Sequence, residues 1–213
     1  MCARNPSDCF FCNEKLFSLN KEMGLPTHDS IIYEDEYVFV TPDLAPVCLG
    51  HYLIVSKKHV NSFGNSDFDA YASMKKAAMF VRQNCYGGKS SLLFEHGAVI
   101  PNTAGASIDH AHLHSIPDNG IRMDDLLLAS STPLPEKMEA SYLTLAAFAK
   151  SKQPYIYYSD SSGEWVRPVE HLPHQFFRHI LSFKDGCNYD WKVSYTSEIS
   201  ARLFRESLAL FRL

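Results

Sequence analysis

Three histidines, His110, His112 and His114, occupy alternate positions within a segment that runs from Ser107 to Pro117. In a β-strand, successive side chains point to opposite faces of the sheet, so residues at alternate positions share one face. The spacing therefore predicts a strand that carries three imidazoles on one face. The chain has 10 histidines in 213 residues, and a cluster of three is more typical of a functional site than of a solvent-facing strand.

The length and composition limit the class of protein. A chain of 213 residues with 46% hydrophobic residues can form one domain, or one domain with a sizeable extension. The net charge of −4 argues against an extended nucleic-acid-binding or membrane-binding surface. The first thirty residues contain no apolar run long enough for a signal peptide or a membrane span. The six cysteines are therefore expected to be reduced thiols in a cytoplasmic protein.

Hydrophobic periodicity and turn residues predict an α+β fold. Residues 1–120 are expected to form the catalytic unit, and residues 121–213 a mainly helical extension packed on the same core. Strands are expected at 31–33, 37–41, 51–56 and 91–95, a hairpin at 155–167, and helices at 68–85, 136–149, 174–183 and 196–211.

The histidine array is compatible with two chemistries. Three protein ligands with an open fourth position would make a catalytic zinc site, although three neighbouring strand residues rarely surround a tetrahedral ion well. Alternatively, one imidazole is a nucleophile that attacks phosphorus, because its unperturbed pKa is about 6.5. Attack gives a covalent phosphoramidate that water then cleaves. The three histidines alone leave both readings open.

The surrounding segments favour the second chemistry. The segment from His110 to Ile116 resembles the His-φ-His-φ-His-φ-φ motif (φ, apolar) of the histidine triad (HIT) superfamily, with Ser115 departing at one φ position. Residues 43–46 and 50–59 are similar to the segment that leads into the fourth histidine of that superfamily. Gly-Ala-Ser at 105–107 resembles its Gly-Gln-Ser/Thr. The resemblance covers residues 9–117 and implies an antiparallel sheet of about five strands with helices packed on it.

The resemblance also implies catalytic roles for individual residues. His112 would be the nucleophile that takes the nucleotidyl group. His114 and His51 would contact phosphate or support the array, and Ser107 would bind a phosphate oxygen. The expected catalytic residues are therefore His112, His114, His51 and Ser107.

Five further residues are candidates for binding substrate. By resemblance, Asp43 would accept hydrogen bonds from ribose hydroxyls, a role that suits an ionised carboxylate, and Leu44 would pack on the base. Asn102 is a polar candidate in the loop before the triad. Gln175 and Arg178 lie outside the resemblance. They are chosen because positions i and i+3 share a helix face and because arginine can grip a distal phosphate.

A Cys-x-x-Cys pair, Cys9 and Cys12, has the spacing of half a metal site. The resemblance implies that His59 and His110 complete it as a closed Cys₂His₂ set, which is typical of structural zinc. The alternative is two reduced cysteines packed beside neighbouring phenylalanines. No organic cofactor is expected.

Together these features predict a nucleotide hydrolase. It would cleave at the α-phosphate of a dinucleoside polyphosphate or other nucleotide conjugate through a nucleotidyl-histidine intermediate, and release a nucleoside monophosphate. The alternatives are a nucleotide-binding regulatory protein with little turnover and a phosphorolytic or nucleotidyl transferase. The expected partners are a nucleotide or dinucleotide substrate and, because related proteins are commonly dimers, a second copy of the chain. No membrane partner is expected.

Overall fold

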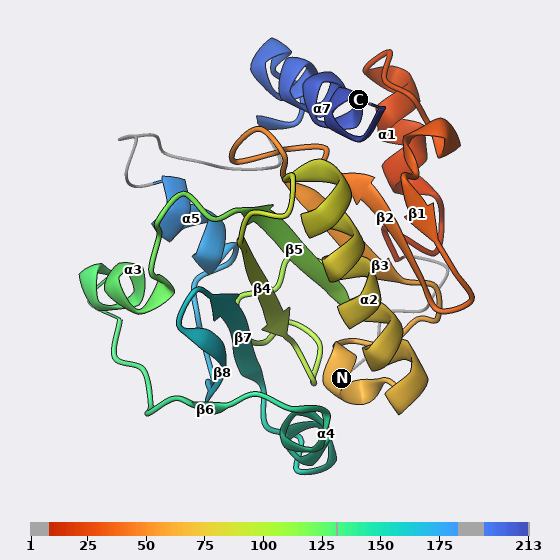
Figure 1. Ribbon diagram of the computed structural model, residues 1–213. Coiled ribbons are helices and arrows are strands. Elements are labelled where there is room, and N and C mark those ends of the chain that lie inside the picture. The colour runs from red at the N-terminus through yellow and green to blue at the C-terminus, as the bar shows by residue number, and fades with distance from the viewer. Residues whose placement is uncertain (1–8, 131, 183–193, 213) are drawn as a thin grey trace.

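The computed structural model describes residues 9–130, 132–182 and 194–212 (Figure 1). Its centre is an antiparallel sheet of eight strands in the order β1-β2-β3-β5-β4-β7-β8-β6. The strands are β1 (Tyr33–Glu34), β2 (Val38–Pro42), β3 (Tyr52–Ser56), β4 (Ser91–Gly97), β5 (His112–Pro117), β6 (Met138–Glu139), β7 (Tyr155–Asp160) and β8 (Gly163–Pro168). The α+β class is confirmed, but the expected count of about five strands was too low.

Helices flank the sheet. They are α1 (Lys15–Glu22), α2 (Phe68–Cys85), α3 (Met123–Ala129), α4 (Tyr142–Lys150), α5 (Phe176–Ser182) and α7 (Glu198–Arg212), with short 3₁₀ turns η2 (His28–Ser30) and η3 (Phe63–Asn65). The longest, α2, begins where predicted because the Asp67 carboxylate accepts a hydrogen bond of 2.9 Å from the Ala70 amide. No described helix has both the length and the apolar composition needed to cross a membrane.

The two faces of the sheet are covered by different parts of the chain. Helix α2 packs Met74 and Val81 against one face, which includes Ile54 of β3 and Leu113 of β5 (Figure 1). The opposite face carries a separate apolar cluster in which Phe177 of α5 contacts Phe94 of β4 at a ring-centroid distance of 4.9 Å. Helix α5 therefore covers the face toward which His112 and His114 point.

The hairpin after residue 150 explains the extra strands. Strand β7 pairs with β4, so that Tyr158 lies opposite Phe94, and β8 and β6 follow outside it. The sequence predicted this hairpin but not its addition to the sheet, since strand partners far apart in sequence leave no local signal. Residues beyond 120 thus continue the sheet built by those before it, and the division at residue 120 stays a prediction.

The histidine segment differs from the expected strand at its first residue. Strand β5 begins at His112, and it pairs with β3 and β4, so that His114 lies opposite Leu53 and Phe94. His110 precedes the strand, where the Ala111 amide donates a hydrogen bond of 2.6 Å to the Val60 carbonyl. Only two of the three histidines therefore share a strand face, and the first is free to point elsewhere.

Candidate active site and metal centre

A pocket with about 540 Å³ of open space lies on the α5 face of the sheet. The residues that line it are Phe10, Phe11, Leu16, Asp43, Leu44, Ala45, Leu53, His96, Gly105, Ser107, Ile108, His112, His114, Gln175 and Arg178. Most of the residues expected to be catalytic or to bind substrate are in this set. His51 lies behind His114 instead, and Asn102 is not in the lining: its backbone amide bonds the Asp109 carboxylate at 2.9 Å.

The hydrogen bonds of His112 determine which of its nitrogens carries the proton. Its Nδ1 lies 2.6 Å from the carbonyl oxygen of His110. A carbonyl oxygen can only accept, so Nδ1 carries the hydrogen and Nε2 keeps its lone pair. Burial lowers the pKa of His112, which favours the neutral ring. A neutral imidazole with an unprotonated Nε2 is the form that can attack phosphorus.

His114 is held in the opposite tautomer through His51. The Val47 amide donates to His51 Nδ1 at 3.1 Å, so the neutral His51 ring carries its hydrogen on Nε2. That Nε2 lies closer to His114 Nδ1, at 2.9 Å, than to Asp43 Oδ2, at 3.3 Å, so we assign its hydrogen bond to His114 Nδ1, which accepts. Burial lowers the pKa of His51 to about 3, so the ring is neutral at pH 7. His114 therefore carries its hydrogen on Nε2 and can donate to a ligand in the pocket.

Asp43 and Arg178 form a buried ion pair beside these histidines. The Asp43 Oδ2 is bound by the Arg178 guanidinium and lies 3.3 Å from His51 Nε2, while Oδ1 accepts from the Ala45 amide at 2.9 Å. Arg178 also donates to the Ala45 carbonyl at 2.6 Å. Burial would raise the pKa of Asp43, but the charge of the Arg178 guanidinium holds it well below its usual range.

This ion pair bears on two of the expected roles. Among the described residues that line the pocket, Asp43 is the acidic side chain and Arg178 is the basic one. The sequence suggested Asp43 for ribose and Arg178 for phosphate, and gave no sign that they bind each other. Both roles stay predictions.

His96 lines the pocket, although nothing in the sequence singled it out as a site residue. It is 7% exposed, and its Nε2 accepts a hydrogen bond of 3.4 Å from the Phe177 amide at the start of α5. A lone histidine after an expected strand gave little reason to single it out. The available signal was alternation, because Phe94 and His96 share the face that carries His114.

The wall beside His96 depends on a glycine. Gly105 has φ of +75°, and a Cβ placed there would come within 2.5 Å of the Pro173 carbonyl oxygen. Its own carbonyl accepts a hydrogen bond of 2.8 Å from the Gln175 amide. Glycine is therefore required where the chain entering α5 crosses the loop that leads to Ser107.

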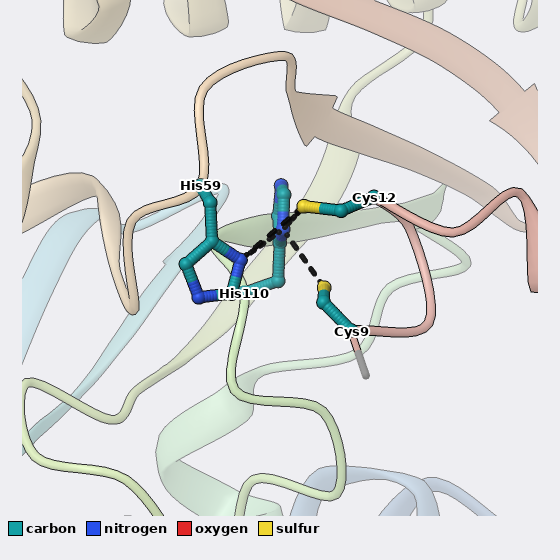
Figure 2. Close-up of side chains that lie close together, drawn as sticks. All are labelled: Cys9, Cys12, His59 and His110. Carbon is teal, nitrogen blue, oxygen red and sulfur yellow. Dashed lines mark hydrogen bonds between the residues drawn. The ribbon is translucent and has the colours of Figure 1, made fainter. Parts of the chain in front are cut away.

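The second cluster consists of Cys9, Cys12, His59 and His110 (Figure 2). Cys9 Sγ and Cys12 Sγ lie 3.2 and 3.6 Å from His110 Nδ1, and Cys12 Sγ lies 3.3 Å from His59 Nδ1. The two Nδ1 atoms are 3.3 Å apart. Zinc bonds of about 2.3 Å to sulfur and about 2.0 Å to nitrogen place tetrahedral ligand atoms roughly 3.3–3.8 Å apart. The four side chains therefore have the spacing needed to hold a metal ion.

Backbone contacts orient His110 toward the thiols. Its Nε2 lies 2.7 Å from the Ser56 carbonyl oxygen and must donate to it, so the Nδ1 lone pair faces Cys9 and Cys12. A second hydrogen bond of this kind commonly fixes the tautomer of a metal-binding histidine. Because the carbonyl of His110 also accepts from His112, the cluster and the pocket share one residue.

Comparison with known proteins gives the family. The HIT domain matches residues 26–121. An uncharacterized HIT-like protein of Methanocaldococcus jannaschii is 30% identical over 113 residues, which are 51% of this chain and 78% of the relative. The chain belongs to the HIT family. An uncharacterized HIT-like protein of Borreliella burgdorferi is 29% identical over 117 residues, covering 52% of the chain and 75% of the relative.

Solved structures are also similar to this HIT protein. A HIT family hydrolase from Clostridium thermocellum is 25% identical with a TM-score of 0.41, covering 55% of this chain and 96% of that one. A hypothetical protein from Leishmania major is 17% identical with a TM-score of 0.43, covering 70% of this chain and 95% of that one.

Proposed function

We propose that this HIT protein is a nucleotidyl hydrolase in which His112 is the nucleophile. The observation that carries the proposal is the pair of opposite tautomers in neighbouring histidines. The hydrogen bond from His112 Nδ1 to the His110 carbonyl, 2.6 Å long, leaves Nε2 as a nucleophile. The His51–His114 contact of 2.9 Å leaves His114 as a donor beside it. Attack and stabilisation of charge require these two forms.

The proposed reaction has two displacements at one phosphorus atom. In the first, the Nε2 lone pair of His112 forms a P–N bond while the bond from phosphorus to the leaving group breaks, and the leaving group departs with the electron pair. In the second, a water oxygen bonds to phosphorus as the P–N bond breaks; His112 recovers its lone pair, and the proton that the water gives up passes to solvent. His114 Nε2–H and the Ser107 hydroxyl would donate to the phosphoryl oxygens as charge redistributes between them.

The substrate we propose is a dinucleoside polyphosphate or another nucleotide conjugate cleaved at its α-phosphate. Leu44 and Phe10 give the pocket an apolar wall on which a base can pack, and Gln175 offers an amide to a distal group. Arg178 could bind a second phosphate only by sharing its guanidinium with Asp43. A transferase would use the same first displacement and replace water with another acceptor.

We propose that the Cys9–Cys12–His59–His110 cluster binds structural zinc. Four protein ligands close a tetrahedral site and leave no position for substrate. When bound, the ion would tie residues 9–12 to the start of the catalytic strand. The cluster itself would then keep the His110 carbonyl in place as the acceptor for His112.

A panel of nucleotide conjugates with product analysis tests this function. Dinucleoside polyphosphates, nucleoside phosphoramidates and adenylylated amines should be compared for release of a nucleoside monophosphate. His112→Asn should reduce release by at least about a thousandfold, as loss of a nucleophile does in other enzymes. Reactions should be stopped without acid, because acid cleaves a phosphoramidate. Denaturing mass spectrometry should then detect a nucleotidyl adduct in the wild-type protein and none in the variant.

Three results separate the proposal from its alternatives. Turnover that persists in His112→Asn would refute covalent catalysis. Nucleotide binding without turnover on any conjugate would favour a binding protein. Activity that tracks metal bound at the triad itself, lost with chelator and regained with zinc, would favour a metalloenzyme.

A further inference from the structure

Among the described residues that line the pocket, His96 is the histidine that neither the triad motif nor the metal cluster explains. It lies on β4 beside the catalytic strand, where Phe94 pairs with His114. Continuing this antiparallel register by two residues brings His96 level with His112. Because Phe94 and His96 point to the same face, the imidazole lies in the pocket lining with His112 and His114.

The start of α5 determines the tautomer of His96. The Phe177 amide donates to Nε2 at 3.4 Å, so Nε2 is the acceptor and the neutral ring carries its hydrogen on Nδ1. The Cδ2 edge of the ring faces the same side, since a Cβ on Gly105 would lie 3.5 Å from it. The Nδ1 edge is therefore turned away from α5. Within the described part of the chain, no hydrogen-bond partner of Nδ1 is found.

The environment of His96 favours a neutral donor over a general acid. The side chain is 7% exposed, and its ring makes an edge-to-face contact with His114 at 6.5 Å. Burial, followed by His112, Arg178 and His174, lowers the pKa of His96 to about 3. The ring is thus uncharged near pH 7, and it can donate a hydrogen bond without releasing its proton.

We propose that His96 is a substrate-binding residue whose Nδ1–H donates to an anionic oxygen of the phosphoryl group attacked by His112. This inference rests on the proposed function and deepens it. His114 Nε2–H, Ser107 and His96 Nδ1–H would then provide three neutral donors around one phosphorus atom. Donors fixed in advance stabilise developing charge without reorganising during the reaction. The ligand class is a phosphate monoester or diester oxygen.

Helix α5 gains a role from this arrangement. Its first turn supplies the amide that orients His96, and the residue before it ties Gly105 through a hydrogen bond of 2.8 Å. Both contacts come from residues beyond 170, outside the segment that matches the HIT domain. The C-terminal part of the chain would therefore position a donor that lies in the HIT domain itself.

Two amide substitutions separate the proposed role from a purely structural one. In His96→Asn the side-chain amide nitrogen can take the place of Nδ1, so the donor to substrate is kept and the contact with Phe177 is lost. In His96→Gln the amide reaches the place of Nε2, so the contact with Phe177 is kept and the donor is lost. We expect kcat/KM of His96→Gln to lie about tenfold below that of His96→Asn, as loss of one net hydrogen bond to the substrate implies. The reverse order would show that His96 only anchors α5.

Nitrogen NMR of histidine-labelled protein tests the inference without requiring turnover. In the free protein, the His96 ¹⁵N shifts should report hydrogen on Nδ1, and inorganic phosphate or AMP should move the Nδ1 resonance. A ring protonated on Nε2, or an Nδ1 resonance that ignores both probes, would overturn the proposal. A response to phosphate with no turnover on any conjugate would leave it standing while the hydrolase function fails. Normal turnover in His96→Gln would instead overturn the proposed role of His96 and leave the hydrolase function standing.

Discussion

The described residues include two groups of potential metal ligands, and each takes one histidine from the segment 110–114. The two groups differ in charge and in hydrogen bonding. Cys9, Cys12, His59 and His110 form one group, and Asp43, His51 and His114 form the other. In each, the ligand atoms lie within 4.8 Å of one another. The spacing of donor atoms therefore does not distinguish them, and other features must.

Charge and tautomer provide the distinction. In the second group the Arg178 guanidinium already binds the Asp43 carboxylate, so the local negative charge is neutralised without a metal. His51 Nε2–H donates to His114 Nδ1, and each of these atoms is therefore committed to a hydrogen bond. In the first group the His110 lone pair faces two thiols. Similar spacing is thus compatible with a metal site in the first group and with a hydrogen-bonded array of side chains in the second.

Removing the thiols should have the largest effect on stability. The double variant Cys9→Ser/Cys12→Ser should lose its bound metal. With free metal about ten thousand times above the dissociation constant, the ion would contribute about 5 kcal/mol to the free energy of unfolding. Metal analysis and denaturant unfolding measure both quantities. Cys85→Ser is the matched control, since that buried thiol lies on α2, away from the cluster. Equal metal content in both variants would contradict the assignment.

Removing Arg178 should have the second-largest effect on stability. It should also make the second group able to bind a metal, as the first group is expected to do. Arg178→Met leaves the Asp43 carboxylate buried without its cation, and breaking such a pair lowers the free energy of unfolding by about 4 kcal/mol. Adding Asp43→Asn should recover more than half of that loss. The single variant should also bind a second zinc ion per chain at Asp43, His51 and His114.

The matched control for this prediction is Arg202→Met, whose side chain is 67% exposed and pairs with Glu206. It should change the free energy of unfolding by less than about 1 kcal/mol. If Arg178→Met is no less stable than this control and takes up no additional metal, then the arginine is not what separates the two groups.

The sequence could identify the members of both groups but not all of their contacts. The helix at 68–85 was predicted correctly because its start and its apolar spacing are local signals. The Cys-x-x-Cys pair and the alternating histidines are also local. The contact between Arg178 and Asp43 joins residues 135 positions apart, and it depends on α5 docking against the sheet. No spacing within the chain encodes that docking, so the ion pair could not be foreseen.

His110 and His96 show the same limit of local sequence patterns. The pattern placed His110 on a strand face that it does not share, and it gave no sign of His96. The strict alternation of the triad predicted three histidines on one strand face, but the Ala111–Val60 hydrogen bond delays the strand until His112 and turns His110 toward the thiols. His96 has no motif, yet its register places it beside the triad. Local pattern finds the candidate residues, whereas strand pairing decides which of them act together.

A pH-dependent effect should appear on the other face of the sheet, beneath the pocket. Glu95 accepts hydrogen bonds from the Phe63 amide at 2.7 Å and the Tyr155 hydroxyl at 2.9 Å. Burial raises the pKa of its carboxyl from 4.5 to about 7, against the lowering effect of these donors. An acid whose pKa is raised by folding gives stability that is complete below the unfolded pKa and is lost as pH rises through the folded pKa.

The comparison with Glu95→Gln isolates this group. From pH 4.5 to pH 7.5 the wild-type protein should lose up to about 3 kcal/mol relative to the variant, because each pKa unit corresponds to about 1.4 kcal/mol. Unfolding midpoints measured across that range give the difference. A constant difference would show that Glu95 is ionised in both states throughout. Since neither metal-capable group contains Glu95, zinc content should not change.

The smallest effect should come from the hydrogen bond between His51 Nε2 and His114 Nδ1. It tests whether the second group serves the proposed catalysis. In His51→Gln the amide can reach the place of Nε2 and still donate to His114 Nδ1. In His51→Asn the amide stays near the place of Nδ1, where it keeps the Val47 contact and loses the donor. We expect His51→Asn to lower kcat/KM about tenfold below His51→Gln, which corresponds to one hydrogen bond of about 1.4 kcal/mol. The His114 ¹⁵N shifts should show hydrogen on Nε2 in His51→Gln and a mixture of tautomers in His51→Asn. If both variants turn over equally and His114 keeps one tautomer, the donor at the place of His51 Nε2 does not determine the tautomer of His114, and the opposite tautomers of His112 and His114 must have another cause.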